Sequence, residues 1–342
     1  MPWSRFEKQW SIQEEGRILS YKDALREAID QAMCLDPKVF AIGLDADDCY
    51  GVYGSMLNLS HPERVLGTPI SENAMTGVAL GAALTGMRPI HIHMRVDFLP
   101  VAMDQITNYV SKWKAMFGGK PKVPLVIRAV VGRGWGCGAQ HSQTLHGMFA
   151  HLPGLSVVTP ATPRDAKGLL LQAIALDEPV LFLEHRWLYK NEGAVPEEMY
   201  TIPLGKGQYL RRGDSLTIVA PSLAAIHSLQ ACEEHDLDVD LIDPRTIKPL
   251  DRELILDSVR RTGRLLVVDY DSPVCGFASE VLALVAEEAP EALLAGAQKM
   301  TFPDVPMPAS GVLERRYYPD PDRIAAKAKA MISRVKGEGA LV

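Results

Sequence analysis

The sequence predicts an α/β protein built from two doubly wound domains, and three observations support this. Short apolar runs alternate with helix-like segments through most of the chain, which is the pattern of parallel sheets covered by helices on both faces. A stretch rich in glycine, proline and charge, residues 186–213, interrupts that alternation and predicts a linker. The length of 342 residues is enough for two domains. We therefore expect domains at 20–185 and 214–342.

The first domain opens with a helix that begins at Ser20, a residue type that caps helix N-termini. Its strands are short runs of aliphatic and β-branched residues, and its helices carry apolar residues at helical spacing. In chain order we expect helix 20–29, strand 39–44, helix 72–86, strand 89–94, helix 99–116, strand 123–130, helix 163–175 and strand 179–184.

The second domain repeats this alternation after the linker. In chain order we expect strand 216–220, helix 222–234, strand 238–242, helix 251–260, strand 264–269 and helix 276–288. Residues 1–19 precede both domains as a polar N-terminal arm with three aromatic anchors, Trp3, Phe6 and Trp10.

Composition excludes several classes of protein. The net charge is −6 and the pI about 5.9, so there is no basic field and we expect no nucleic-acid partner. The five cysteines are scattered without a Cys-x-x-Cys pair, which argues against a disulfide framework or a zinc site. No apolar run approaches the roughly 20 residues of a membrane span. The N-terminus does not read as a signal peptide, so we expect a cytoplasmic protein without membrane association.

The segment 68–86 places a single acid, Glu72, at the start of a helix whose other residues are small or apolar. Ser71 stands at the N-cap position of that helix. A carboxyl group in such surroundings is suited to share a proton with a ligand near neutral pH. The alternative is a first-turn acid that is favoured only by the helix dipole, which is common.

A glycine-rich loop, residues 132–143, follows the expected strand 123–130. Open α/β sheets form their ligand crevices at this edge, and alternate glycines let the backbone approach a ligand closely. The loop carries His141 and does not match the dinucleotide pattern Gly-x-Gly-x-x-Gly. His141 is therefore a candidate active-site residue; the alternative is an ordinary histidine of a surface loop.

Phe98 lies where the expected strand 89–94 passes into the expected helix 99–116. Helical spacing predicts that Leu99, Met103 and Ile106 form a buried stripe on that helix. A buried aromatic residue at such a junction usually only fills the hydrophobic core. That is the alternative to a role of Phe98 in ligand binding.

These segments together resemble the β subunits of thiamin-diphosphate-dependent 2-oxoacid dehydrogenases. The resemblance rests on the Glu72 segment, on a Gly-x-x-His-Ser-Gln motif at 138–143, and on a His-x-Pro-Gly-Leu motif at 151–155. An Asp-Gln pair at 104–105 and the segment 241–251 (LIDPRTIKPLD) match as well. The motifs recur in the family's order from about residue 20 to residue 335.

The resemblance implies a transketolase-like pyrimidine-binding domain at 20–185 and a transketolase C-terminal-type domain at 214–342. In that family the glutamate that Glu72 matches meets the aminopyrimidine ring of the cofactor, and the aromatic residue at Phe98 packs against the ring. Ile70 is expected beside them as a cofactor-binding residue. His141 matches the active-site histidine that faces the substrate. The C-terminal domain is expected to support dimer contacts and complex assembly.

The resemblance also implies a partner subunit. The wider family binds the Mg²⁺-diphosphate end of the cofactor with a Gly-Asp-Gly motif and a later asparagine, and this chain has no Gly-Asp-Gly. We therefore expect no metal ligands in this chain, an α subunit that supplies them, an α2β2 assembly, and no activity in the isolated chain. The expected reaction is decarboxylation of a 2-oxo acid with transfer to a lipoyl group, which implies a lipoyl-bearing E2-type partner.

Two alternatives remain open. A two-subunit transketolase-like or acyloin-forming enzyme would pass the two-carbon unit to a carbonyl group, whereas a non-catalytic scaffold would need none of Glu72, Phe98 and His141. The chain also departs from the family pattern in ways that favour a specialised relative over a housekeeping pyruvate dehydrogenase. The departures are Gly43-Leu44-Asp45 for Gly-Glu-Asp, Asp269-Tyr270 for His-Glu, Cys275-Gly276-Phe277 for Gly-Gly-Phe, and Leu176-Asp177-Glu178-Pro179 for Asp-x-Asn-Pro.

Overall fold

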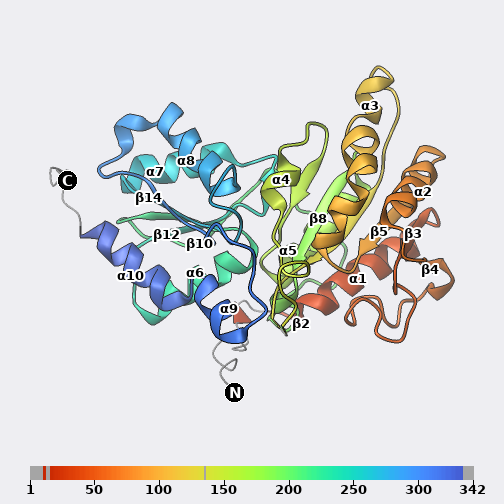
Figure 1. The fold of residues 1–342 in the computed structure, drawn as a ribbon, viewed down its shortest axis with the longest axis horizontal. Helices are drawn as coiled ribbons and strands as arrows, with labels where there is room; N and C mark the ends of the chain where they lie inside the picture. Colours follow the sequence, from red (N-terminus) through yellow and green to blue (C-terminus); the bar gives the residue numbers. More distant parts are fainter. Residues whose placement is uncertain (1–10, 13–15, 135, 334–342) are drawn as a thin grey trace.

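The computed structural model describes residues 11–12, 16–134 and 136–333, which form two α/β halves side by side (Figure 1). Seven strands form the sheet of the first half, and all neighbouring pairs are parallel except the antiparallel pair β13–β7. In spatial order the strands are β13 (Thr246–Lys248), β7 (Ser156–Val158), β8 (Val180–His185), β6 (Val126–Val131), β5 (Arg88–His93), β3 (Val39–Gly43) and β4 (Val65–Gly67).

The second half contains a five-stranded sheet, parallel except for its edge strand β10. Its spatial order is β10 (Gln208–Arg211), β12 (Asp240–Asp243), β11 (Thr217–Val219), β14 (Leu265–Val268) and β15 (Gln298–Met300). A small third sheet ties the start of the described chain to the segment after β8. It consists of β1 (Ser11–Ile12), β9 (Glu192–Ala194) and β2 (Ile18–Ser20).

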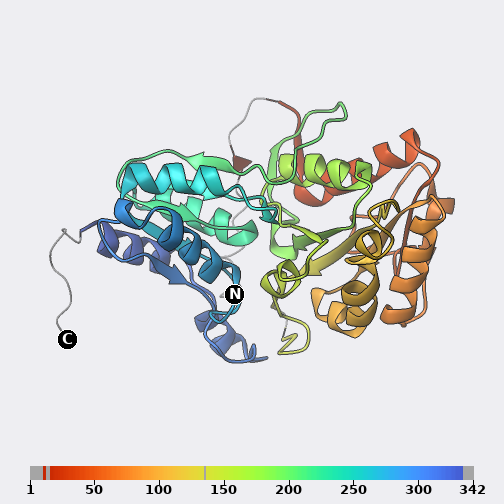
Figure 2. The ribbon, with the colours of Figure 1, turned by 90° about the horizontal axis from the view of Figure 1, so that it is seen from above.

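Helices cover both faces of each large sheet, so the α/β doubly wound class is confirmed (Figures 1 and 2). The helices of one face are α1 (Tyr21–Leu35), α5 (Pro163–Ala175), α6 (Ser222–Glu234) and α10 (Pro321–Ile332), and their apolar residues belong to one core cluster. The helices of the other face are α2 (Glu72–Leu84), α3 (Trp113–Met116), α4 (His146–Ala150), α7 (Arg252–Thr262) and α8 (Phe277–Glu288), and most of their buried apolar residues belong to a second cluster. A further short helix is α9 (Gly311–Tyr317).

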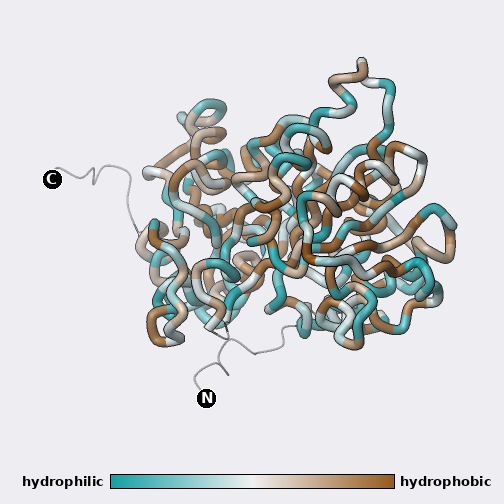
Figure 3. Tube along the Cα trace, turned by 45° about the vertical axis from the view of Figure 1, so that its right-hand side comes forward, coloured by the Kyte–Doolittle hydropathy of each residue, from teal (hydrophilic) through white to brown (hydrophobic). Residues whose placement is uncertain are grey.

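The central strands are mostly apolar because both of their faces are covered, and the buried charges Arg128 in β6 and Glu184 in β8 pair with each other at 2.7 Å. Every residue of β6 and β8 is buried. Hydropathy follows the same arrangement, with brown apolar segments running through the interior of both halves (Figure 3). Helix α1 begins after Ser20, whose hydroxyl accepts the Asp23 backbone N–H at 3.2 Å, as its sequence signal predicted.

One expectation needs correction, and two further features of the fold were not anticipated. The expected helix 99–116 is irregular: a 3₁₀ turn, η2 (Val96–Ala102), leads into a π-helical stretch, η3 (Gln105–Val110), and then into α3. Pro100 inside η2 cannot donate an N–H, which favours this break. The expected linker 186–213 contains β9 and β10, which complete two sheets. Strand β13 comes from the second half of the chain yet joins the first sheet.

The expected anchors Trp3, Phe6 and Trp10 lie outside the described residues. Within the described part of the chain, no helix is long and apolar enough to cross a membrane.

Candidate functional site

A small pocket lies at the carboxyl edge of the first sheet. Its walls come from the residues that follow β3 and β4, from the first turn of α2, from the end of β5 and from η2. The pocket is lined by Leu44, Thr68, Pro69, Ile70, Ser71, Glu72, Met75, His91, Ile92, His93, Met94 and Phe98. Parallel α/β sheets bind ligands outside this edge, because the loops that follow the strands converge there.

Three predicted site residues, Ile70, Glu72 and Phe98, therefore line one pocket. Glu72 is the first residue of α2 and is half-buried, and Ser71 stands at the N-cap position without a side-chain capping bond. Ile70 is 77% exposed, so its side chain offers an apolar surface beside the pocket. The acid, the aliphatic side chain and the aromatic ring thus border the same pocket.

The fourth predicted residue, His141, is exposed and contacts the pocket through Phe98. The two ring centroids are 5.4 Å apart and the ring planes are perpendicular. Edge-to-face contact of this kind is the preferred arrangement of aromatic pairs. The structure thus brings all four predicted residues together, although they come from three separate stretches of the sequence.

The loop that carries His141 is held by two charged residues that shortly precede Phe98 in the sequence, Arg95 and Asp97. Arg95 is buried and donates from Nη1 to the carbonyl oxygens of Gly132 and His141, at 2.9 and 3.1 Å. The carboxylate of Asp97 accepts from the backbone N–H and from the side-chain amide of Gln143, both at 3.0 Å. The backbone on each side of the His141 ring is therefore fixed relative to the pocket.

A third anchor fixes the start of the loop to the second half of the chain. Arg133 is fully buried, with its guanidinium carbon 3.2 Å from the ring centroid of Tyr318 and 4.5 Å from that of Trp187. The carboxylate of Glu314 in α9 accepts the N–H of Gly134 at 2.7 Å. Figure 2 shows the loop meeting the segment that bears α9. The C-terminal half, expected to serve assembly, thus also positions the loop of His141.

Two buried histidines form part of the pocket wall and were missed from the sequence. His91 and His93 alternate on β5 and so point to the same face of the sheet. Burial lowers the pKa of His91 to about 4, and burial together with the neighbouring His91 lowers the pKa of His93 well below its usual range. Both imidazoles are therefore neutral at physiological pH. Their spacing of two residues, in a strand whose other residues after Arg88 are apolar, was the available signal.

His146, the first residue of α4, joins the two halves. Its Nε2 lies 3.0 Å from Asp269 Oδ1 and 3.5 Å from Asp271 Oδ2, and all three side chains are buried. Burial alone would lower the pKa of His146, but the two carboxylates outweigh it and raise the pKa to about 9. His146 therefore makes its polar contacts within the fold.

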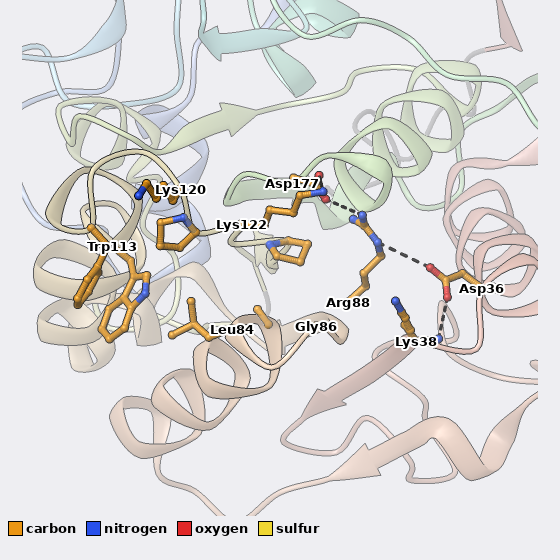
Figure 4. A pocket seen from close by; sticks show the side chains of 13 residues that line it. Asp36, Lys38, Leu84, Gly86, Arg88, Trp113, Lys120, Lys122 and Asp177 are labelled. Atoms are coloured by element: carbon orange, nitrogen blue, oxygen red, sulfur yellow. Dashed lines mark hydrogen bonds and ion pairs between the residues drawn. The ribbon is translucent and has the colours of Figure 1, made fainter.

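A larger hollow of about 800 Å³ lies at the opposite edge of the same sheet. It is lined by residues at or just before the amino ends of strands, such as Lys38 and Arg88, and by Trp113 and Lys120 (Figure 4). Arg88 is already occupied there, because it pairs with Asp177 at 2.6 Å. None of the four predicted site residues lines this hollow, so we place the functional site at the carboxyl edge.

Fold and site together define a transketolase-type α/β unit that presents an acid, an aromatic ring and a loop histidine at one sheet edge. Comparison with known proteins agrees with this class. Residues 18–192 match the family described as transketolase, pyrimidine-binding domain, and residues 205–324 match transketolase, C-terminal domain. A split-gene transketolase solved as an inactive β4 tetramer has the same fold, with a TM-score of 0.74 at 23% identity over 93% of this chain and 99% of that one.

Curated relatives narrow the class. The β subunit of acetoin:2,6-dichlorophenolindophenol oxidoreductase from Cupriavidus necator is 45% identical over 92% of this chain and 97% of its own length. The β subunit of 2-oxoisovalerate dehydrogenase from Bacillus subtilis is 36% identical over 92% and 98%. A mitochondrial pyruvate dehydrogenase E1 β subunit from Oryza sativa is 38% identical over 92% and 86%. The chain belongs to this family of E1-type β subunits.

Proposed function

We propose that this chain is the β half of a two-subunit, thiamin-diphosphate-dependent dehydrogenase that breaks the bond beside the carbonyl carbon of a 2-oxo acid. The observation that carries the proposal is the convergence of Ile70, Glu72 and Phe98 on one pocket, with the ring of His141 against Phe98. An acid, a flat apolar surface and a nearby histidine form a set that suits a planar heterocycle with a reacting substrate beside it.

The residues of the pocket fit the aminopyrimidine end of thiamin diphosphate. Besides the Glu72 carboxyl and the Phe98 ring, the wall contains a buried imidazole nitrogen, His93 Nε2, that has no hydrogen-bond partner within the described residues. A ring with nitrogen atoms on its edge suits this mixture of apolar faces and polar groups. When bound, the cofactor supplies the nucleophilic carbon that adds to the substrate carbonyl.

Each residue of this chain then has a definite task. Glu72 holds a proton at a ring nitrogen of the cofactor, and Phe98 fixes the plane of that ring. His141 stands at the open side of the pocket, where it moves a proton at the substrate oxygen. General acid–base groups placed in this way contribute typically 10²–10⁴-fold to turnover.

The diphosphate and its Mg²⁺ require ligands from elsewhere. In the part of the chain that the structure describes, one group of side chains has the spacing to hold a metal ion, Glu234, His235 and Asp322, and it lies at the end of α6 and in α10, in the second half. We therefore assign the diphosphate and Mg²⁺ ligands to an α subunit in an α2β2 assembly. A lipoyl-bearing E2-type protein is the proposed acceptor.

Acetoin is a second candidate substrate. The observation that favours acetoin is sequence identity. This chain is 45% and 40% identical to two β subunits of acetoin:2,6-dichlorophenolindophenol oxidoreductases, and 36% identical to the β subunit of 2-oxoisovalerate dehydrogenase. Acetoin also carries a carbonyl carbon beside the bond to be broken, so the same pocket chemistry applies.

Reconstitution tests both candidates. The chain is co-expressed with its α partner, and the purified complex is assayed with thiamin diphosphate, Mg²⁺ and a reducible dye on pyruvate, branched 2-oxo acids and acetoin. We expect dye reduction with one substrate class by the complex and none by either subunit alone. Formation of a carbon–carbon-bonded product without any electron acceptor would instead favour the acyloin-forming alternative. Activity of the isolated chain would contradict the split site.

A further inference from the structure

Strand β5 places two imidazoles, His91 and His93, in the wall of the Glu72 pocket, and they differ in one respect. Both side chains are almost completely buried, at 2% and 4% exposure. Both ring nitrogens of His91 have partners, whereas Nε2 of His93 has none among the described residues. His91 can therefore serve as the comparison for His93.

Both ring nitrogens of His91 contact polar groups within the fold. Its Nδ1 lies 3.2 Å from the carbonyl oxygen of Ile42 in β3, and its Nε2 lies 3.0 Å from Thr76 Oγ1 in α2. A carbonyl oxygen can only accept, so we assign the ring proton to Nδ1. His91 Nε2 then faces the Thr76 hydroxyl, which also lies 2.7 Å from the carbonyl oxygen of Glu72. His91, in β5, is thus connected to strand β3 and to helix α2. Neither of its ring nitrogens is left to bind a ligand.

Hydrogen bonds within the described residues do not use the Nε2 atom of His93. Its ring meets His91 edge to face, with centroids 4.4 Å apart and planes at 72°, which is a packing contact. A buried polar nitrogen without a partner is costly to the fold, and an apolar side chain of the same shape would avoid that cost. Such groups are rare in folded proteins and occur where a ligand, a water molecule or a strained functional site requires them.

The surroundings indicate what kind of partner His93 takes. Glu72 is the only acid among the residues that line the pocket, and the lining contains no lysine or arginine. Burial and the neighbouring His91 keep the His93 imidazole neutral, so it offers one hydrogen bond and no charge. A neutral, nitrogen-containing ring edge is a better match for this group than an anion such as a phosphate or a carboxylate.

We propose that His93 makes the second polar contact to the ring that Glu72 binds, with Nε2 hydrogen-bonded to the nitrogen-bearing edge of the aminopyrimidine. This inference rests on the proposed function, because it takes thiamin diphosphate as the occupant of the pocket. It assigns a cofactor-binding role to a residue of this chain beyond the four that the sequence indicated.

The test compares three variants of the reconstituted α–β complex: His93→Phe, His93→Gln and His91→Phe. Two quantities are measured for each, the thermal midpoint of the cofactor-free complex and the dissociation constant of thiamin diphosphate by calorimetry with Mg²⁺. Phenylalanine keeps a flat ring and removes the hydrogen bond, whereas glutamine restores a donor and an acceptor. His91→Phe is the matched control, because it removes the partnered imidazole from the same strand.

We expect His93→Phe to leave the thermal midpoint of the cofactor-free complex unchanged or higher. The same variant should weaken cofactor binding by roughly 5- to 50-fold, the factor for loss of one buried hydrogen bond. His93→Gln should recover part of the affinity. His91→Phe should behave in the opposite way and lower the thermal midpoint, because it removes the two contacts by which the His91 ring connects β3 to α2.

Two results would overturn the inference while leaving the proposed function in place. One is wild-type cofactor affinity in His93→Phe. The other is a loss of thermal stability in His93→Phe as large as that in His91→Phe, which would make His93 a structural residue. If the unmodified complex itself binds no thiamin diphosphate, the proposed function fails, and that outcome is distinct from both.

Discussion

The imidazole of His141 meets the ring of Phe98 edge to face, with the centroids 5.4 Å apart and the planes at 90°. One ring belongs to the loop after β6 and the other to η2 after β5. Through this contact an exposed histidine is positioned against the same aromatic side chain that lines the Glu72 pocket. A change at Phe98 should therefore affect both the ligand in the pocket and the histidine outside it.

Phe98→Leu keeps an apolar side chain in the pocket wall and removes the aromatic edge-to-face contact. Aromatic pairs of this kind contribute about 0.5–1.5 kcal/mol beyond their buried area. We expect turnover by the reconstituted complex to fall roughly 2- to 13-fold, the range to which that energy corresponds. Phe98→Tyr keeps the ring and should stay close to the unmodified enzyme. Equal turnover for the leucine and tyrosine variants would show that the ring contact has no role.

Arg95→Met removes the guanidinium that donates to the carbonyl oxygens of Gly132 and His141. These hydrogen bonds hold the loop that carries His141 and do not hold the pocket. We therefore expect kcat to fall by at least roughly tenfold, the cost of misplacing a catalytic group. The affinity for thiamin diphosphate should change little. Lys120→Met, at the hollow on the opposite sheet edge, is the control with an equal loss of charge. A parallel loss of cofactor affinity in Arg95→Met would argue against this division of roles.

The pairing of His146 with Asp269 and Asp271 predicts a pH dependence of stability. The pKa of His146 is about 9 in the folded chain, against about 6.5 for an unfolded histidine. Because the folded pKa is the higher one, the stabilisation is fully present below about pH 6.5 and is lost as the pH rises through about 9. The loss of unfolding free energy should be on the order of 3 kcal/mol.

Thermal unfolding between pH 6 and about 9.5 measures this effect for His146. Asp269→Asn removes the nearer carboxylate, so in that variant the decline should be smaller and should end at a lower pH. A thermal midpoint that is flat across the interval in the unmodified chain would exclude a charged His146 in the fold.

Glu314→Ala tests the anchor between the two halves. It removes the acceptor of the Gly134 N–H and leaves the buried guanidinium of Arg133 without its carboxylate. Breaking one side of a buried ion pair costs about 3–5 kcal/mol, so we expect a large drop in unfolding free energy. Glu314→Gln keeps an acceptor for the N–H and should lose less. If the alanine variant also lowers kcat of the complex at saturating cofactor, the C-terminal half positions the His141 loop.

Much of this site could be predicted from the sequence because its parts are local signals. Glu72 stands out as one acid in an apolar helix, and His141 as the histidine of a glycine-rich loop after a buried strand. The irregular turn at η2 could not be predicted from helical periodicity, because Leu99 and Ile106 are buried in either geometry.

Contacts between distant segments could not be predicted in the same way. The cage around Arg133 unites a loop residue with Trp187 and Tyr318, far along the chain, and no periodicity connects them. Strand β13 joins the first sheet although it lies in the range 214–342, because tertiary pairing with β7 decides its place. His91 and His93 gain their meaning only when β5 is seen to border the pocket.

The central claim is that the Glu72 carboxyl acts on a cofactor bound partly by this chain, and one measurement tests it most directly. Turnover of the reconstituted α–β complex is compared between the unmodified chain and Glu72→Gln at saturating thiamin diphosphate and Mg²⁺, with thermal unfolding as the check on folding. The account predicts an intact fold and turnover reduced by roughly 10²- to 10⁴-fold. Turnover of Glu72→Gln within a factor of about two or three of the unmodified complex, far below the effect of a positioned proton-transfer group, would contradict it.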